Sequence, residues 1–269
     1  GYLPGAYAPF SVGGDPSKPN FRVRDLDAPG GVTISIEARR RDMLQNLDKF
    51  SAEVETSSAT QARDAFYGQA YRLLGSAAAR AAFDLNKEPP ALRNRYGRKR
   101  IGQGCLLARR LVEAGTRFVT VVDQGWDTHQ DIARNLPDAR FRGSGKLPAM
   151  DRAYATLLSD LRERGLLEST LVVLMGEFGR TPKINNRAGR DHWPRAGFVC
   201  FSGGGVKGGQ VIGATDANGE APIRQPVRPE DIAFSMLKLL GIDPHREFKA
   251  SGNRPMRILD KGAMIERLA

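Results

Sequence analysis

Three short polar segments of this chain carry residue types that bind metal ions and support hydrolysis. They occupy residues 123–129 (DQGWDTH), 176–182 (GEFGRTP) and 189–194 (GRDHWP). The whole chain has three histidines, and two of them, His129 and His192, lie here with a carboxylate one or two residues away. Aspartate, glutamate and neutral histidine are the side chains that hold a divalent ion for hydrolytic chemistry. The pattern therefore predicts a metal centre.

In the first segment, Asp127 and His129 are alternate residues of a loop. A bent loop would bring a carboxylate oxygen and an imidazole nitrogen to the same ion. The alternative is that Asp127 caps the next segment while His129 donates to a backbone carbonyl. Asp123 is a weaker candidate, because it can equally cap the turn at Gly125. The spacing alone leaves these interpretations open.

In the second segment, Glu177 follows an apolar run, where a partly buried and unpaired carboxylate is costly. It needs either a metal ion or an ion pair with Arg180, three residues further on. Arg180 could instead face an anionic substrate, because its planar fork suits sulfate or phosphate. His192, in the third segment, has two similar interpretations: a metal ligand, or a surface partner of Asp191.

The elements that must position these segments follow from hydrophobic periodicity. Apolar runs at residues 118–122, 171–175 and 197–201 predict buried strands, and the first two end directly before a polar segment. Helical patterns cover residues 103–114, 147–164 and 229–240. Alternating strands and helices predict an α/β fold with a mostly parallel sheet flanked by helices. In such sheets ligands bind outside the carboxyl ends of the strands, where the polar segments lie.

We expect a single domain over residues 1–269, itself an incomplete one. Its predicted parts are an irregular arm at 1–31, a helical section at 32–90 with helices at 34–53 and 59–83, and an α/β core at 103–269. The chain opens at Gly1, without Met and inside loop-like sequence, so we expect it to be the C-terminal part of a longer protein. The glycine-rich run 203–209 lacks the GK[ST] ending of a phosphate loop and predicts a tight turn between two strands.

Composition narrows the choice of partners. The net charge of +11 would attract an anionic substrate or partner over long range. Nucleic acid is the lowest-ranked partner, because the densest basic run, residues 93–100, is loop-like and reads as solvated surface. Cys105 and Cys200 fall inside predicted elements and are expected to be buried thiols. The sequence shows no 18-residue apolar run and no signal peptide, so we expect no membrane span.

Five motifs stand out when they are taken in order: GWDTH at 125–129, MGEFGRTP at 175–182, GRDHWP at 189–194, GGGVKGGQVIGATD at 203–216, and PEDI with LLGIDP within 229–244. Together they resemble the DUF1501 family, within the alkaline phosphatase/sulfatase-like superfamily. The opening YAPFSVGGDP also looks like a mid-chain segment of that family, so the resemblance covers nearly the whole chain. It implies an alkaline phosphatase-like α/β domain with a metal centre at the strand ends.

The resemblance also implies a set of ligands. Asp127 and His129 would correspond to ligands that follow one central strand, Glu177 to the carboxylate after the next strand, and His192 to a later histidine. The cofactor would be a divalent metal, Zn, Ca or Mg. Phe178 stands where superfamily members usually have a histidine, so one nitrogen ligand is missing.

Other expected roles depend on the same resemblance. Arg180 and Arg190 would stabilise charge on the non-bridging oxygens of an ester. The superfamily's first aspartate ligand and its nucleophile would lie before Gly1. Longer family members look exported, so we expect a periplasmic or extracellular protein.

Two functions compete on this reasoning. The first is a metal-dependent, sulfatase-like hydrolase of sulfate or phosphate esters, acting on an anionic small molecule or polysaccharide ester. The alternative is a non-catalytic binding or scaffold protein that retains the fold. Convergence of Asp127, His129, Glu177 and His192 in space would favour the metal centre.

Overall fold

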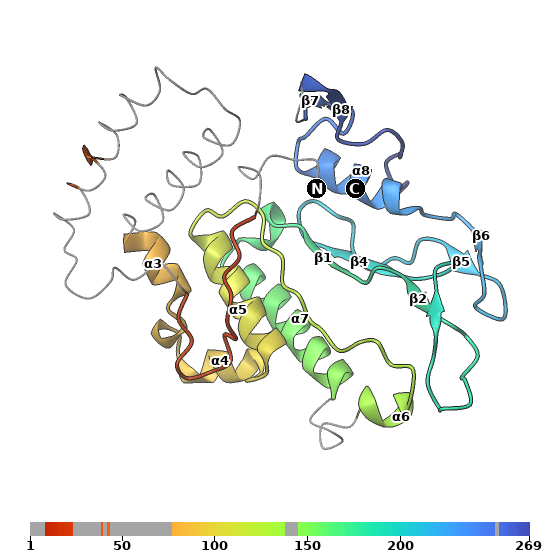
Figure 1. Ribbon diagram of the computed structural model, residues 1–269, viewed down its shortest axis with the longest axis horizontal. Coiled ribbons are helices and arrows are strands. Elements are labelled where there is room, and N and C mark those ends of the chain that lie inside the picture. The colour runs from red at the N-terminus through yellow and green to blue at the C-terminus, as the bar shows by residue number, and fades with distance from the viewer. Residues whose placement is uncertain (1–8, 24–38, 40–41, 44–76, 138–144, 251–252) are drawn as a thin grey trace.

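The computed structural model describes residues 9–23, 39, 42–43, 77–137, 145–250 and 253–269 (Figure 1). Its helices are α3 (Ala77–Phe83), η2 (Leu85–Lys87), α4 (Pro90–Tyr96), α5 (Arg100–Glu113), α6 (Ile132–Asn135), α7 (Lys146–Glu163), η3 (Leu167–Ser169) and α8 (Pro229–Leu239). Its strands are β1 (Val172–Met175), β2 (Gly179–Arg180), β3 (His192–Trp193), β4 (Val199–Ser202), β5 (Ala214–Thr215), β6 (Pro222–Arg224), β7 (Glu247–Lys249) and β8 (Pro255–Arg257).

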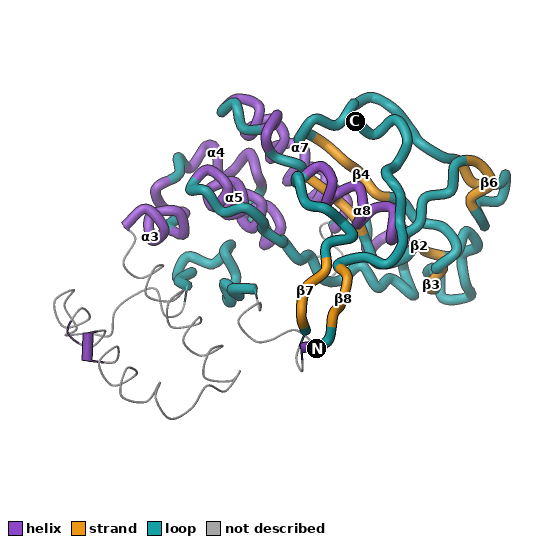
Figure 2. The backbone as a smooth tube through the Cα atoms, turned by 90° about the horizontal axis from the view of Figure 1, so that it is seen from above, coloured by secondary structure: helices purple, strands orange, loops and turns teal. Residues whose placement is uncertain are grey.

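Helices α3, α4, α5 and α7 pack together, and most of the strands lie to one side of them (Figures 1 and 2). Apolar residues recur three to four positions apart along α5 and α7, which places them on one face of each helix. Gly115 ends α5 and Gly165 ends α7, both with positive φ, the backbone conformation that favours glycine after a helix. The shared core consists mainly of Tyr96, Leu106, Leu107, Leu111, Ala153, Leu157 and Leu161.

An ionic network is buried inside this helical layer. The Arg109 side chain is only 1% exposed, and its Nε and Nη2 atoms lie 2.9 Å from Asp160 and 2.7 Å from Glu88. Arg110 also contacts Glu88, and Tyr96 donates a 2.8 Å hydrogen bond to Asp160. Burial raises the pKa of Glu88, but hydrogen bonds from Arg109 and Arg110 outweigh that effect and hold the pKa below its usual value. The network therefore ties α4, α5 and α7 together through fixed charges.

All sheets in the described part of the chain are two-stranded and antiparallel: β1 with β4, β2 with β3, β5 with β6, and β7 with β8. The mixture of helices and strands agrees with the predicted α/β class, but the predicted parallel sheet does not occur among these residues. Parallel pairing needs a crossover, usually a helix. The chain between β1 and β4 forms the short strands β2 and β3 instead of a helix, so β4 returns antiparallel to β1.

Two of the three predicted strands are confirmed, although neither is buried as predicted, and the third is wrong. The runs at 171–175 and 197–201 became β1 and β4, each within two residues of the predicted bounds. The run at 118–122 is irregular, and its Phe118 and Val122 are 63% and 62% exposed. Val119 and Val121 do pack against the helical core. The segment thus has exposed and packed side chains like those of a half-buried strand, but no described strand pairs with it.

The helix predictions at 103–114, 147–164 and 229–240 are confirmed as α5, α7 and α8, with ends shifted by at most three residues. Most of the predicted helix at 34–53 falls outside the described residues, and the described ones, 39 and 42–43, are helical. Most of the predicted helix at 59–83 also falls outside them, apart from α3 at its end. The glycine-rich run 203–209 is a turn after β4, as predicted. It does not join paired strands, because β5 begins only at Ala214 and pairs with β6.

The two cysteines are free thiols. Cys105 is buried, which raises the pKa of its thiol to about 12, whereas Cys200 is only partly buried on β4. No helix within the described residues has the length and apolar character needed to cross a membrane.

Candidate metal centre

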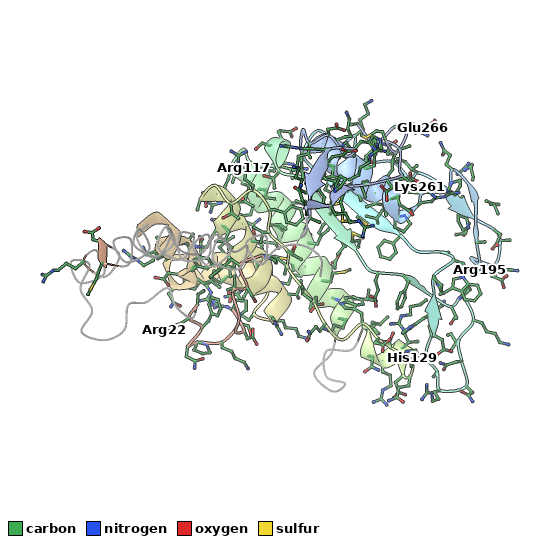
Figure 3. All side chains as sticks on the ribbon, turned by 45° about the horizontal axis from the view of Figure 1, so that its top comes forward. Arg22, Arg117, His129, Arg195, Lys261 and Glu266 are labelled. Atoms are coloured by element: carbon green, nitrogen blue, oxygen red, sulfur yellow. The ribbon has the colours of Figure 1, made fainter. Side chains whose placement is uncertain are left out.

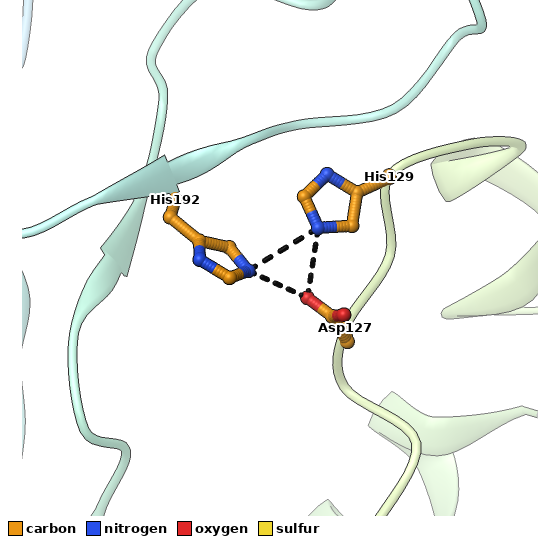
Figure 4. Close-up of side chains that lie close together, drawn as sticks. All are labelled: Asp127, His129 and His192. Atoms are coloured by element: carbon orange, nitrogen blue, oxygen red, sulfur yellow. Dashed lines mark hydrogen bonds and ion pairs between the residues drawn. The ribbon is translucent and has the colours of Figure 1, made fainter.

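Three predicted ligands meet at one point of the surface (Figure 4). The Asp127 Oδ1 atom lies 2.8 Å from His192 Nε2 and 3.0 Å from His129 Nε2. The two Nε2 atoms are 3.2 Å apart. Asp127 is 66% exposed, so a solute can approach the group directly. We call Asp127, His129 and His192 the three-ligand cluster.

The cluster joins two loops that are distant in sequence. Gln130 and Ala188 form an isolated antiparallel bridge, and the Arg190 amide donates to the Thr128 carbonyl at 3.1 Å. Gly189 is required at this crossing, because a Cβ atom there would lie 2.0 Å from the carbonyl carbon of His129. The backbone therefore holds residues 127–132 against residues 185–191. Figure 3 shows His129 at this end of the molecule, away from Arg117.

The β2–β3 pair positions His192, the third member of the cluster. In its register Arg180 stands opposite His192, and Gly179 stands opposite Trp193. A Cβ atom on Gly179 would lie 1.7 Å from the carbonyl oxygen of Ala196, so only glycine fits. The ring of Phe178 packs against the His192 imidazole with centroids 4.4 Å apart. This packing limits where the His192 ring can turn.

Arg180 lies at the edge of the cluster and binds its carboxylate. The Nη2 atom donates to Asp127 Oδ1 at 2.7 Å, and the guanidinium also donates to the carbonyls of Trp126 and Arg190. The hydrogen bond from Arg180, followed by that from His192, lowers the pKa of Asp127 to about 2. Asp127 is therefore a carboxylate at any physiological pH, as a metal ligand must be.

The arrangement fits a divalent ion. Atoms bound to a tetrahedral ion at about 2.0–2.2 Å stand roughly 3.3–3.6 Å apart. The cluster atoms are 2.8–3.2 Å apart, so an outward movement of a few tenths of an ångström admits the ion. Two imidazole nitrogens and one carboxylate oxygen make up the donor set.

The family model described as "Protein of unknown function (DUF1501)" matches residues 1–269. The chain belongs to the DUF1501 family. No curated protein matches this chain, and no solved structure does. The match confirms the family predicted from the motifs.

Other predicted site residues of this DUF1501 chain lie outside the cluster. Glu177 is exposed and shares no hydrogen bond or ion pair with any other described residue. The Arg190 guanidinium donates to the carbonyls of Thr181 and Pro182 at 2.8 and 2.9 Å. These bonds hold the Arg190 guanidinium against the 181–182 backbone and not against the three-ligand cluster.

Asp123, the weaker candidate of the first segment, is also held by structural contacts. The Trp126 indole donates to its Oδ2 at 2.8 Å, and Lys146 lies 3.2 Å from its Oδ1. These bonds fix the start of the loop that carries Asp127 and His129.

Two residues that our sequence reasoning missed support the DUF1501 site. Asp191 Oδ1 lies 2.8 Å from His129 Nδ1, and Asn185 Nδ2 donates to the same carboxylate oxygen at 3.1 Å. The bond with His129, followed by that from Asn185, lowers the pKa of Asp191 against the effect of its partial burial. The adjacency of Asp191 and His192 suggested that they pair with each other, whereas Asp191 binds the distant His129. No sequence pattern indicated Asn185.

Proposed function

We propose that this DUF1501 protein is a metal-dependent hydrolase of sulfate or phosphate esters. The observation that supports it best is the convergence of Asp127, His129 and His192 from loops more than 60 residues apart. An exposed Asp–His–His cluster with mutually close ligand atoms is the donor arrangement of catalytic metal sites that keep an open position. A bound divalent ion would polarise the ester oxygen.

The donor set favours zinc over calcium or magnesium. Imidazole nitrogen suits zinc, whereas calcium and magnesium take oxygen ligands. We propose Glu177 as a further ligand, because its carboxylate is exposed and unpaired within the described chain and lies two residues after the end of β1. Its neighbour Phe178 packs on His192, which places the Glu177 backbone beside the cluster.

Arg180 is the proposed contact for the anionic part of the ester. Its planar guanidinium matches the oxygens of sulfate or phosphate and lies directly against Asp127. The net charge of +11 favours the approach of such an anion. Arg190 would act indirectly, by holding the 181–182 backbone that follows Arg180.

The wider relationship to the alkaline phosphatase/sulfatase-like superfamily belongs to the same proposal. The order of the motifs supports it, and so does the position of Glu177 two residues after the end of β1. Export to the periplasm or the cell exterior is proposed on the same basis. The nucleophile is proposed to come from a residue outside the three-ligand cluster.

A non-catalytic binding protein is the second candidate. The observation in its favour is that Asp127 Oδ1 already contacts Arg180, His129 and His192, which makes a complete ionic cluster without an ion. Phe178, in place of a nitrogen ligand, favours the same interpretation.

Metal titration followed by ester assays tests the proposal. The protein is dialysed against a chelator and titrated with Zn²⁺, Mg²⁺ and Ca²⁺ by calorimetry, alongside His129→Ala and the control His245→Ala. Zinc binding that His129→Ala abolishes and His245→Ala preserves is the expected result. Absence of zinc binding overturns the metal centre.

The ester assay separates the two candidates. The natural full-length protein, loaded with zinc, is assayed on p-nitrophenyl sulfate and p-nitrophenyl phosphate. Turnover that depends on His129 supports the hydrolase. Zinc binding with no turnover of either ester favours the non-catalytic alternative.

A further inference from the structure

We propose that Asp191 is a positioning residue that fixes the tautomer and orientation of His129 within the three-ligand cluster. This inference deepens the proposed function and depends on it for its metal-binding part. Asp191 is not a ligand itself, but by orienting the ligand His129 it affects the affinity of the cluster for a metal ion.

The two nitrogens of His129 have different partners. Nδ1 lies 2.8 Å from Asp191 Oδ1, while Nε2 faces Asp127 and His192. An ionised carboxylate only accepts hydrogen bonds, and His129 faces one at each nitrogen. Of these two contacts, only the 2.8 Å contact at Nδ1 has hydrogen-bond geometry, whereas Nε2 lies 3.0 Å from Asp127 Oδ1 as an ion pair, so Nδ1 is the nitrogen that carries the proton of the neutral ring. The Nε2 lone pair then points into the cluster, as metal ligation requires.

Asp191 is itself held in place from both sides. Its amide donates to Thr181 Oγ1 at 3.0 Å, and its carbonyl accepts from the Thr181 amide at 2.9 Å. Asn185 donates to its carboxylate and also to the His129 carbonyl, both at 3.1 Å. The Asp191 backbone and carboxylate are therefore both held, and the carboxylate orients the His129 ring through Nδ1.

The consecutive residues Asp191 and His192 contact different nitrogens of the same His129 ring. Neighbouring side chains of an extended segment point in opposite directions. Asp191 reaches His129 at Nδ1, and His192 meets the same ring at Nε2, 3.2 Å away. Within the described chain, no residue hydrogen-bonds His192 Nδ1, so the structure fixes only the His129 tautomer in this way.

The first measurement needs no metal. Long-range ¹H–¹⁵N NMR of the imidazole rings reports which nitrogen carries the proton. We expect His129 of the metal-free protein to show the Nδ1–H form, and Asp191→Ala to lose that preference. His245, at a distant exposed position, serves as the internal reference.

The second measurement is zinc affinity. Removing the carboxylate partner of a metal-ligating histidine typically lowers affinity 10- to 100-fold. We expect that loss for Asp191→Ala, and a smaller one for Asp191→Asn, which keeps an acceptor oxygen of the same shape. Asp216→Asn is the matched control, because Asp216 caps its own 216–221 turn.

The outcomes separate this inference from the proposed function. If the wild-type protein binds no zinc, the metal centre fails, while the NMR result still decides the role of Asp191. If it binds zinc but Asp191→Ala changes neither the tautomer nor the affinity, the role of Asp191 is overturned and the metal centre stands. Asp191→Asn preserves the shape of the side chain, so it decides the question even if the alanine variant unfolds.

Discussion

Two ionic groups of this protein use similar residues in opposite surroundings. Between α5 and α7, Arg109 binds Glu88 and Asp160, and all three side chains are at most 7% exposed. At the three-ligand cluster, Arg180 binds Asp127, which is 66% exposed. Burial makes the first group a structural element, because every charge there needs its partner. Exposure leaves the second group free to exchange one partner for a ligand.

The difference predicts where substitutions act. In the helical layer, loss of Arg109 leaves two buried carboxylates with one cation fewer each, and stability falls. At the cluster, water can solvate whatever is left, so stability changes little while ligand binding changes strongly. Each prediction below tests this division between structure and function.

The largest effect is expected at the centre of the buried group. Arg109→Met leaves the buried Glu88 and Asp160 without the cation that they share and with only Arg110 and Arg164, respectively, as partners. The free energy of unfolding should therefore fall by about 3 kcal/mol, the lower end for a broken buried pair. Urea unfolding followed by circular dichroism measures this loss.

An exposed arginine provides the matched control for that measurement. Arg95 pairs with Glu163 at side-chain exposures of 48% and 56%, so Arg95→Met should leave the free energy of unfolding nearly unchanged. Equal losses for the two variants would remove the distinction between buried and exposed ion pairs here.

The next largest effect is expected on metal affinity. His192→Ala removes one of three ligands and should weaken zinc binding by at least roughly 100-fold, as calorimetry would record. Because His192 is half exposed, the urea midpoint should stay within the error of the wild type. A large drop in stability with unchanged zinc affinity would make the cluster a structural feature.

The sequence predicted local features of this site better than their arrangement. Asp127, His129 and His192 were identified because histidine is rare in the chain and stood beside carboxylates. Their meeting depends on the crossing of two loops at Gly189, where the absent Cβ allows close backbone contact. No local pattern specifies that crossing, because it depends on atoms more than 50 residues apart.

The strand errors have a similar origin. The run at 118–122 has the composition of a buried strand, but a strand also needs a partner, and none is described beside it. The direction of β4 depended on what lies between it and β1, which composition does not reveal. Helices were predicted more accurately, because their hydrogen bonds and their 3.6-residue period are local.

Acidification should reveal the buried group through stability. Burial raises the pKa values of Glu88 and Asp160, but hydrogen bonds from arginines and Tyr96 outweigh it and lower both below their ordinary values of 4.5 and 3.8. Groups with a lowered folded pKa stabilise fully above the ordinary value and lose that contribution as pH falls through the folded pKa.

We therefore expect the free energy of unfolding to decline below about pH 4.5, and to decline less steeply in Arg109→Met, where one cation that lowers both pKa values is gone while Arg110 and Arg164 remain. Urea titrations between pH 7 and about pH 3 measure the two slopes. A steeper acid dependence in the variant would contradict the assignment.

The smallest and most selective effect is expected at Arg180, which competes with a metal ion for Asp127 Oδ1. Arg180→Gln removes a positive charge and frees that oxygen, so zinc affinity should rise roughly fivefold, the size expected for one nearby unit charge at an exposed site. Affinity of the zinc-loaded protein for inorganic phosphate should fall, because the guanidinium that receives the anion is gone. Lys183→Gln removes the same charge from the same loop without a contact to Asp127, and should change both affinities less. If Arg180→Gln weakened zinc binding, Arg180 would be a support for Asp127 and not its competitor, and the exposed group would resemble the buried one after all.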